Sequence, residues 1–497
     1  MAETRLTGLD ASFLHIEDEA SHMHVAGVMV FGGDPPPYDD LLENIESRLH
    51  LVPRYRQRLA MVPLGQGRPK WVDDPHLNLR YHVRYTALPA PGSEDQLRAL
   101  AGRVFSQQLD RDKPLWELWV AEGLEGGRFA VLSKTHHALV DGVSGVDIAS
   151  VLFDSSPDPV PTDPGRRWLP APLPSRAQLL GEALLERATQ PAEIVRSVRA
   201  VLRAPRRVAG NVRDALVGVG AMAWAGLNPA PTSLYNQSIG PHRRFTWVRV
   251  SLDDVKAIKN ALGGTVNDVM LATVAGALGR HLRRRGVDTD GLELKAMVPV
   301  SVRAEAERGA LGNKVTAMMA ALPVWCRDPV TRMELISEQL AGLKEGGQAV
   351  GAQVLTDLTG FAPPNLMSQA SRLVSRQRFF NLVVTNVPGP QFPLYLMGRE
   401  MEDTFPMAPL AKNQGVGVAI MSYNGRINFG IVGDYDVLYD LEQLQEDFVD
   451  SLGELADAAG VKLKRRRRRV ASSANGGPRG TGRPPKPVVS VTDPEET

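Results

Sequence analysis

The sequence predicts an α/β protein, built as an α+β sandwich of two domains. Three observations support this fold class. The chain has 497 residues, which is more than one ordinary hydrophobic core accommodates. Residues 1–154 and 243–460 each mix strand-like and helix-like hydrophobic patterns. A proline-rich stretch lies between these two regions.

The composition narrows the class of protein. The formal charge of +1, from 57 basic and 56 acidic residues, argues against a globally basic nucleic-acid binder, so we expect no nucleic-acid partner. Cys326 is the only cysteine, so no internal disulfide can form, which fits a reducing cytoplasm. The first ten residues contain no apolar run, and we expect no signal peptide. The run Ala215–Leu227 has 13 residues and falls short of the ~20 of a membrane-spanning helix, so we expect a soluble or peripheral protein.

The first region, residues 1–154, contains strand and helix patterns. The segments "HVAGVMVF" (24–31) and "RFAVLSK" (128–134) predict strands, and "EDQLRALAGRVFSQQL" (94–109) predicts a helix. A second helix is expected at Ser144–Phe153, with its apolar residues on one face. We assign this region to the N-terminal domain.

Residues 155–242 predict a connection between the domains. Ser155–Ser175 holds seven prolines in 21 residues, which excludes a helix or a central strand. The helical segment Ile194–Arg213 has six arginines and no acidic residue, which is typical of a helix at a lipid interface, with a solvated basic face as the plain alternative.

Residues 243–460 predict a second mixed domain. Strands are expected at 244–252, 294–302, 313–324 and 379–387. Helix starts are predicted at Ser251, which is followed three residues later by Asp254, and at Thr265. Asn424–Gly425 separates two β-rich runs and predicts a type I′ hairpin turn. A last amphipathic helix ends at Gly460, and residues 461–497 predict a basic, disordered tail that includes Lys464–Arg469.

The stretch "SKTHHALVDG" (133–142) carries the strongest chemical signal. Neighbouring residues on a strand point to opposite faces, so His136 and His137 are poorly placed to bind one metal ion, and no zinc-ligand spacing accompanies them. Two packed strand histidines are the plain alternative. A general base needs one ring nitrogen free and the ring held in place. The adjacent histidine can hold it, Asp141 can tie down the loop, and Gly142 allows a close approach of the ligand.

These residues lead to a family resemblance. "HHALVDG" resembles the HHxxxDG signature of the coenzyme-A-dependent acyltransferases, the superfamily of chloramphenicol acetyltransferase and condensation domains. The ordered set "LTGLDASFLHIE", "PRYRQRL", "DKPLWELW", "GGTVNDVMLATVAGALGRHL", "MVPVSVR…LGNKV" and "VVTNVPGP" resembles the bacterial wax ester synthase/diacylglycerol acyltransferase family over residues 1–460. The resemblance implies two chloramphenicol-acetyltransferase-like domains with an active-site tunnel between them.

The resemblance also implies a reaction and site residues. His137 would be the base that takes the proton from an alcohol as it attacks acyl-CoA, which is a substrate, so that no cofactor and no metal are required. His136 would be its structural partner. Asp141 would fix the loop, through an ion pair for which Arg303 is the candidate. Asn267 and Thr385 are candidates for stabilising the oxyanion, although Asn267 could instead bond the helix start and Thr385 could be a plain strand residue.

Two tryptophans and an aspartate are considered as substrate contacts. Trp116 and Trp119 of "PLWELW" are expected on one face of a strand, either in the core or lining an acyl or acceptor channel. Asp268 follows Asn267 in the family motif and is assigned to substrate binding on that basis.

The sequence thus predicts acyl transfer from acyl-CoA to diacylglycerol, a long-chain alcohol, or both. Two alternatives stay open: another acceptor such as a peptide or sugar, and a silent lipid-binding homologue. We expect a cytoplasmic enzyme attached peripherally to the inner membrane face or to lipid droplets.

Overall fold

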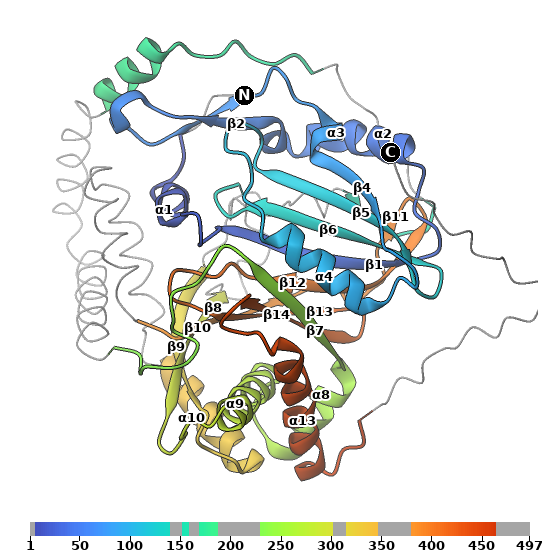
Figure 1. Ribbon diagram of the computed structural model, residues 1–497, viewed down its shortest axis with the longest axis vertical. Helices are drawn as coiled ribbons and strands as arrows, with labels where there is room; N and C mark the ends of the chain where they lie inside the picture. The colour runs from blue at the N-terminus through green and yellow to red at the C-terminus, as the bar shows by residue number, and fades with distance from the viewer. Residues whose placement is uncertain are drawn as a thin grey trace, which may run out of the picture. The chain divides into compact units, whose positions relative to one another are not determined.

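The computed structural model describes residues 5–139, 152–158, 168–186, 229–301, 315–345 and 379–463. Within them the chain forms two six-stranded mixed sheets and a small two-stranded one (Figure 1). The expected α/β class is confirmed, since helices cover faces of both large sheets.

The first sheet carries the paired histidines. Its strand order is β11, β12, β1, β6, β5, β4. The bounds are β11 Tyr395–Leu396, β12 Arg399–Met407, β1 His24–Gly32, β6 Arg128–His136, β5 Trp116–Leu124 and β4 Val83–Ala87. β1 and β6 are antiparallel, with His24 opposite His136. The strands expected at 24–31 and 128–134 are therefore confirmed.

The first sheet is packed on both faces. One face packs on a core to which α1 (Gly8–Ile16) and α2 (Tyr38–Arg48) contribute, and the other on α4 (Glu94–Phe105). α3 (Leu79–His82), the 3₁₀ turns η1 (Leu49–Leu51), η2 (Pro53–Arg56) and η3 (Pro63–Gly65), and the small sheet of β2 (Gln57–Ala60) and β3 (Lys70–Asp73) complete this half.

The end of α4 is anchored by polar side chains of the sheet. Lys134 Nζ donates to the carbonyl oxygens of Val104 (3.2 Å) and Gln107 (2.9 Å), and His24 Nε2 lies 3.3 Å from that of Phe105. The last carbonyls of a helix have no partner within the helix, so these fully buried side chains supply the missing donors.

The second sheet has the order β7, β14, β13, β10, β8, β9. The bounds are β7 Arg243–Ser251, β14 Arg426–Asp434, β13 Val416–Tyr423, β10 Leu382–Pro388, β8 Glu293–Ser301 and β9 Val315–Pro323. All four expected strands and the hairpin are confirmed; Asn424 (φ 42°) and Gly425 (φ 77°) both adopt the left-handed region that a type I′ turn requires.

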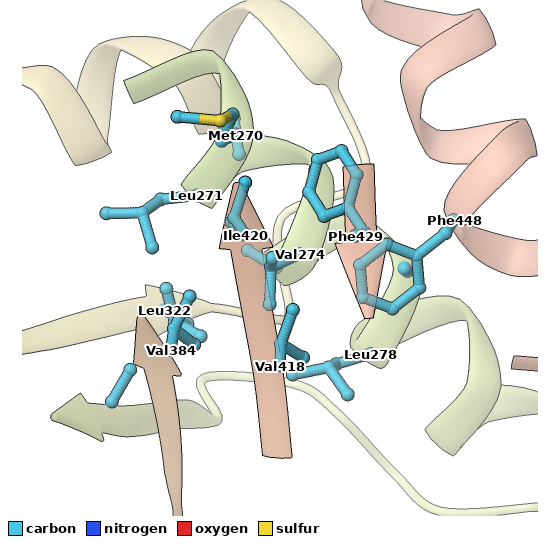
Figure 2. Close-up of a cluster of buried hydrophobic side chains, with 14 of the residues drawn as sticks. Met270, Leu271, Val274, Leu278, Leu322, Val384, Val418, Ile420, Phe429 and Phe448 are labelled. Atoms are coloured by element: carbon cyan, nitrogen blue, oxygen red, sulfur yellow. The ribbon is translucent and has the colours of Figure 1, made fainter. Parts of the chain in front are cut away.

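Four helices cover one face of this sheet (Figure 1). They are α8 Leu252–Leu262, α9 Val266–Arg284, α10 Pro329–Glu345 and α13 Leu441–Ala458. Figure 2 shows the core between them: Val274 and Leu278 of α9 meet Val418 of β13, and Phe429 of β14 lies beside Phe448 of α13. Apolar residues along nearly the whole length of α9 are buried, which explains its weak amphipathic pattern.

The helix starts follow the sequence prediction. Ser251 Oγ accepts the Asp254 N–H at the start of α8. At α9 the bonds are reciprocal: Thr265 Oγ1 accepts the Asp268 N–H (3.2 Å), and Asp268 Oδ2 accepts the Thr265 N–H (2.8 Å). α9 thus begins with a complete capping box.

Strand β12 crosses the predicted domain division. It comes from residues expected in the 243–460 domain, yet it pairs antiparallel with β1 in the first sheet. Its other contacts reach the second sheet, where Asn428 Nδ2 of β14 donates to the Thr404 carbonyl (2.9 Å). A division at residue 243 therefore does not describe this strand, and the boundaries expected at 154 and 243 stay a prediction.

Several expectations lie outside the described residues. These are most of the helix at Ser144–Phe153, the arginine-rich segment Ile194–Arg213, and the basic run Lys464–Arg469. Of the 155–242 connection, residues 168–175 have no regular structure and residues 176–186 are helical. In the described part of the chain no single helix is long and apolar enough to cross a bilayer; α8 and α9 meet the test only as a pair bent by 94°.

A glycine substitution tests the seating of β12 on β14. A Cβ atom on Gly430 would lie 1.8 Å from the Pro406 carbonyl oxygen. Gly430→Ala should therefore destabilise the protein by about 1–3 kcal/mol or more, as overpacking does. Gly453→Ala in α13 is the matched control, because its Cβ would meet nothing within 4 Å. Thermal unfolding should show a lower melting temperature for the first variant alone; equal melting temperatures would contradict this seating.

Candidate active site

The two histidines lie at the end of β6, between its two neighbours in the sheet. The His136 N–H donates to the Leu115 carbonyl (3.0 Å), just before β5, and the His137 N–H donates to the Met23 carbonyl (2.8 Å), just before β1. A turn follows at once, because the Leu139 N–H bonds back to the His136 carbonyl (2.9 Å). The backbone at the pair is held on both sides by main-chain bonds.

His136 is buried and both of its ring nitrogens face protein groups. Its Nδ1 accepts the Ala138 N–H (3.0 Å), and its Nε2 lies 3.4 Å from Glu17 Oε2. An imidazole nitrogen that accepts a hydrogen bond carries no proton, so the neutral ring has its hydrogen on Nε2, facing the carboxylate. The side chain is 1% exposed.

His137 is placed differently. Its ring stacks on Phe13 of α1, with centroids 4.0 Å apart, and it is only partly buried. Burial lowers its pKa to about 4, an effect that a bond to its own backbone opposes and the nearby His136 reinforces. At neutral pH the ring is therefore uncharged. Among the described residues no other side chain bonds to it, which leaves a nitrogen lone pair for a substrate proton.

Glu17 and Arg111 belong to this site and were given no role from the sequence. Arg111 Nε donates to Glu17 Oε2 (2.9 Å), and the Glu17 carboxyl is 3% exposed. Burial by itself would raise the pKa of Glu17, but His136 and Arg111 together lower it below the usual value. In "LTGLDASFLHIE", Phe13 and Glu17 lie one helical turn apart. This spacing is the signal in the sequence that could have indicated Glu17.

Asn267 and Thr385 lie in the other half of the chain. Asn267 is in the first turn of α9, and its Oδ1 accepts from Asn386 Nδ2 of β10 (3.0 Å). This bond joins the helix start to β10, and Asn386, inside "VVTNVPGP", is another residue to which the sequence gave no role. Thr385 is partly buried and neighbours Asn386, so it points to the opposite face of β10.

The structure brings some of these residues together and not others. His136 and His137 share a site with Phe13 and Glu17. No hydrogen bond or ring contact within the described ranges joins His137 to Asn267 or Thr385. Asp141, Gly142 and Arg303 lie outside the described residues, so the ion pair expected between Asp141 and Arg303 stays a prediction.

The tryptophans require a correction. Positions three apart on a strand face opposite sides, so Trp116 and Trp119 of β5 do not share one face as we expected. Trp116 is fully buried in the core, where it stacks on His82 (4.6 Å) and its Nε1 donates to the Tyr55 carbonyl (2.9 Å). We therefore reassign Trp116 from substrate contact to core packing.

Asp268 also has a structural role in place of the substrate contact that we expected. Its Oδ2 caps α9 and accepts from Ser337 Oγ of α10 (2.9 Å), and the residue is 4% exposed. The backbone position in the first turn explains this, because a carboxylate there accepts the free N–H groups of the helix start.

The part of the chain that the structure describes was also compared with the usual arrangement of metal ligands. No group of three or more histidine, cysteine, aspartate or glutamate side chains is placed to hold an ion there.

Comparisons with known proteins show the family to which the sequence is similar. A sequence model of the wax ester synthase/diacylglycerol acyltransferase catalytic domain matches residues 6–270, and one of the WS/DGAT C-terminal domain matches residues 311–456. The chain is 35% identical to the probable diacylglycerol O-acyltransferase tgs1 of Mycobacterium tuberculosis H37Rv, over 94% of this chain and 99% of that protein. It is 33% identical to the probable diacylglycerol O-acyltransferase tgs2 of the same strain, over 91% and 98%.

Solved structures give the same result. The wax ester synthase/diacylglycerol acyltransferase of Marinobacter aquaeolei VT8 is 27% identical and superposes with a TM-score of 0.64, over 92% of this chain and 100% of that one. A starter condensation domain of rhizomide synthetase shares the fold at 15% identity, with a TM-score of 0.55 over 93% and 98%. The resemblance seen in the motifs is thereby confirmed: the chain belongs to the wax ester synthase/diacylglycerol acyltransferase family.

Proposed function

We propose that the chain is an O-acyltransferase that moves a long-chain fatty acyl group from acyl-CoA to diacylglycerol or to a fatty alcohol, with His137 as the general base. One observation supports this role above the others. Of the two adjacent imidazoles, His137 is the one that is partly exposed, and no other side chain of the described residues bonds to its ring nitrogens. Its pKa, lowered to about 4, keeps this ring neutral at physiological pH.

The reaction would proceed in two steps. The acceptor hydroxyl gives its proton to His137 as its oxygen attacks the thioester carbon, which forms a tetrahedral oxyanion. The intermediate then collapses, the C–S bond breaks, and the proton passes from His137 to the thiolate, which leaves ester and free CoA. No covalent acyl-enzyme is required.

His136 is unsuited to the same task. Its Nδ1 lone pair already accepts the Ala138 N–H, and its Nε2 faces the buried Glu17 carboxylate. Taking a substrate proton at Nδ1 would break the bond from the Ala138 N–H, in the turn that follows β6. This contrast supports the division into a base and a structural partner that the family resemblance implies.

The oxyanion requires a hydrogen-bond donor, for which we propose the Asn267 amide or the Thr385 hydroxyl. Asn386 occupies Oδ1 of Asn267, which leaves its NH₂ group as the available donor. Thr385 is polar and partly buried in the middle of β10, on the face opposite the covering helices. A donor placed before the reaction typically contributes ~10²–10³-fold in rate. We also propose that the substrates meet in an active-site tunnel between the two acyltransferase-like domains.

Substitutions of the motif should fail in different ways. His137→Ala removes the base, so kcat should fall by ~10²- to 10⁴-fold while the protein stays folded and binds acyl-CoA. His136→Ala leaves the base but empties a packed position. It should lower the free energy of unfolding by about 1–3 kcal/mol, and with it the melting temperature, as well as kcat. Asp141→Ala should resemble His136→Ala. A folded, inactive His136→Ala beside an active His137→Ala would reverse the two roles.

Acceptor preference is tested by direct competition. Purified protein with palmitoyl-CoA should acylate both diacylglycerol and hexadecanol at unequal rates, because an apolar channel discriminates a methylene by only ~10- to 200-fold. Thioester loss and ester formation should be measured together. Activity on a small polar amine with rejection of every long-chain hydroxyl would favour a different acceptor, and no transfer to any acceptor would favour a silent lipid-binding homologue.

We also propose peripheral attachment to the cytoplasmic membrane face or to lipid droplets. The basic segments Ile194–Arg213 and Lys464–Arg469 would supply charge, at roughly 1 kcal/mol per residue near an anionic surface. An exposed apolar surface supports the idea. Its residues are Met61, Leu64, Leu169, Leu173, Leu184 and Leu185, between 43% and 84% exposed.

These residues come from two segments that lie side by side. The Ala171 N–H donates to Asp73 Oδ2 (3.0 Å), and Lys70 Nζ donates to Glu182 Oε2 (2.9 Å). The 168–186 segment therefore runs along the β2–β3 hairpin, and Met61 and Leu64 lie in the loop between those two strands. Exposed apolar patches of this kind mark partner or membrane surfaces.

Vesicle flotation separates charge from apolar contact. Truncation after Gly460 should weaken binding to phosphatidylserine-containing vesicles at low salt, whereas Leu64→Ser with Leu185→Ser should weaken it at any salt concentration. Val449→Ser is the control, since Val449 is 51% exposed in α13, remote in sequence from both segments. Unchanged flotation of both variants would remove these surfaces from the proposal.

A further inference from the structure

The end of helix α1 contacts both histidines of the motif. Phe13 stacks on His137, and Glu17, four residues later, approaches His136. The Glu17 N–H donates to the Phe13 carbonyl (3.1 Å), so the last helical turn fixes the spacing of the two side chains. One turn of helix thus meets each imidazole with a different chemical group.

Glu17 is a buried carboxylate whose position is fixed from a second direction. Arg111 donates to Glu17 Oε2 through Nε (2.9 Å) and to the Leu14 carbonyl through Nη2 (3.2 Å). The guanidinium therefore binds the end of α1 at two points. A planar fork of donors is suited to this, since it orients the carboxylate as well as neutralising it.

The contacts of His136 favour one of its two neutral tautomers. Ala138 N–H bonds to Nδ1 only when Nδ1 carries no proton. An ionised carboxylate accepts hydrogen bonds and donates none, so it favours the hydrogen on Nε2. The 3.4 Å separation of Nε2 and Glu17 Oε2 is that of a loose contact, and such contacts in active sites often tighten only when substrate binds.

We propose that Glu17, oriented by Arg111, is a positioning residue for catalysis. It holds His136 in the Nε2–H tautomer, which keeps the Ala138 bond and with it the turn that aims His137 at the acceptor hydroxyl. Phe13 fixes the plane of the His137 ring from the same helix. This inference rests on the proposed role of His137 as the base.

The test compares one substitution at two positions of the same segment. Glu17→Gln keeps the shape of the side chain but can donate a hydrogen bond to Nε2 and so stabilise the wrong tautomer. We expect kcat to fall by about 10- to 100-fold, with the KM for palmitoyl-CoA unchanged. Glu19→Gln, an exposed residue two positions along, makes the same change in charge and should leave kcat unchanged.

A double variant distinguishes positioning from a general loss of structure. If Glu17 acts through His136, Glu17→Gln combined with His136→Ala should be no slower than His136→Ala alone. Losses that multiply would overturn the inference. Thermal unfolding of each variant is measured in parallel. Arg111→Ala is the second probe, because the Arg111 side chain is 45% exposed and its removal disturbs the core less. This variant should lower kcat by about 10-fold or less.

The outcomes separate this inference from the proposed function. If Glu17→Gln and Arg111→Ala both match Glu19→Gln while His137→Ala is inactive, the positioning role is wrong and the base assignment stands. If His137→Ala itself keeps near-normal kcat, the proposed function fails, and the positioning role fails with it.

Discussion

The antiparallel pairing of β12 with β1 connects the two halves of the molecule. Val28 lies opposite Phe405 and Val30 opposite Asp403, so a strand that occurs late in the chain becomes part of the sheet that carries the histidines. The same strand packs on β14, where Gly430 provides the room that a side chain would fill. Without this pairing, β1 would be an open edge, and the sheet that positions His137 would lose a neighbour.

Buried ion pairs join β12 to the strands of the second sheet. Asp403 is fully buried on β12 and forms ion pairs with Arg249 of β7 (2.9 Å) and with Arg426 of β14. Arg249 also forms two bonds with Glu94 at the start of α4 (2.9 and 2.7 Å). Removing one partner of such a network leaves an uncompensated charge, which typically costs about 3–5 kcal/mol. The geometry of the active-site strand thus depends on contacts made by residues from both halves.

Local chemistry explains what could be predicted from the sequence. The type I′ turn at Asn424–Gly425 and the cap at Thr265 are determined by neighbouring residues, and the strands that carry them follow from alternating apolar side chains. The adjacent histidines were found because they form a short motif, His136 and His137, with a chemical reason for each residue type.

Long-range contacts explain what could not be predicted. β12 was not expected as a strand, because charged residues interrupt its apolar pattern and Asp403 is buried only through partners far along the chain. Glu17 acquires its role from Arg111, 94 residues away, and Asn267 from Asn386, 119 residues away. Trp116 was misassigned because the strand period was not applied to a spacing of three residues.

The pH dependence of kcat/KM shows whether His137 is a base that its surroundings keep neutral. This ratio reports the pKa of the essential base in the free enzyme. Because burial lowers the pKa of His137 to about 4, the base form persists as the pH falls through the usual histidine range, and it is lost only as the pH approaches that lower value. We expect a constant kcat/KM for palmitoyl-CoA transfer from pH 8 down to about pH 6. The fall in kcat/KM should be centred well below pH 6.5, which is an ordinary histidine pKa. A midpoint at or above 6.5, in protein shown to be folded throughout, would contradict it.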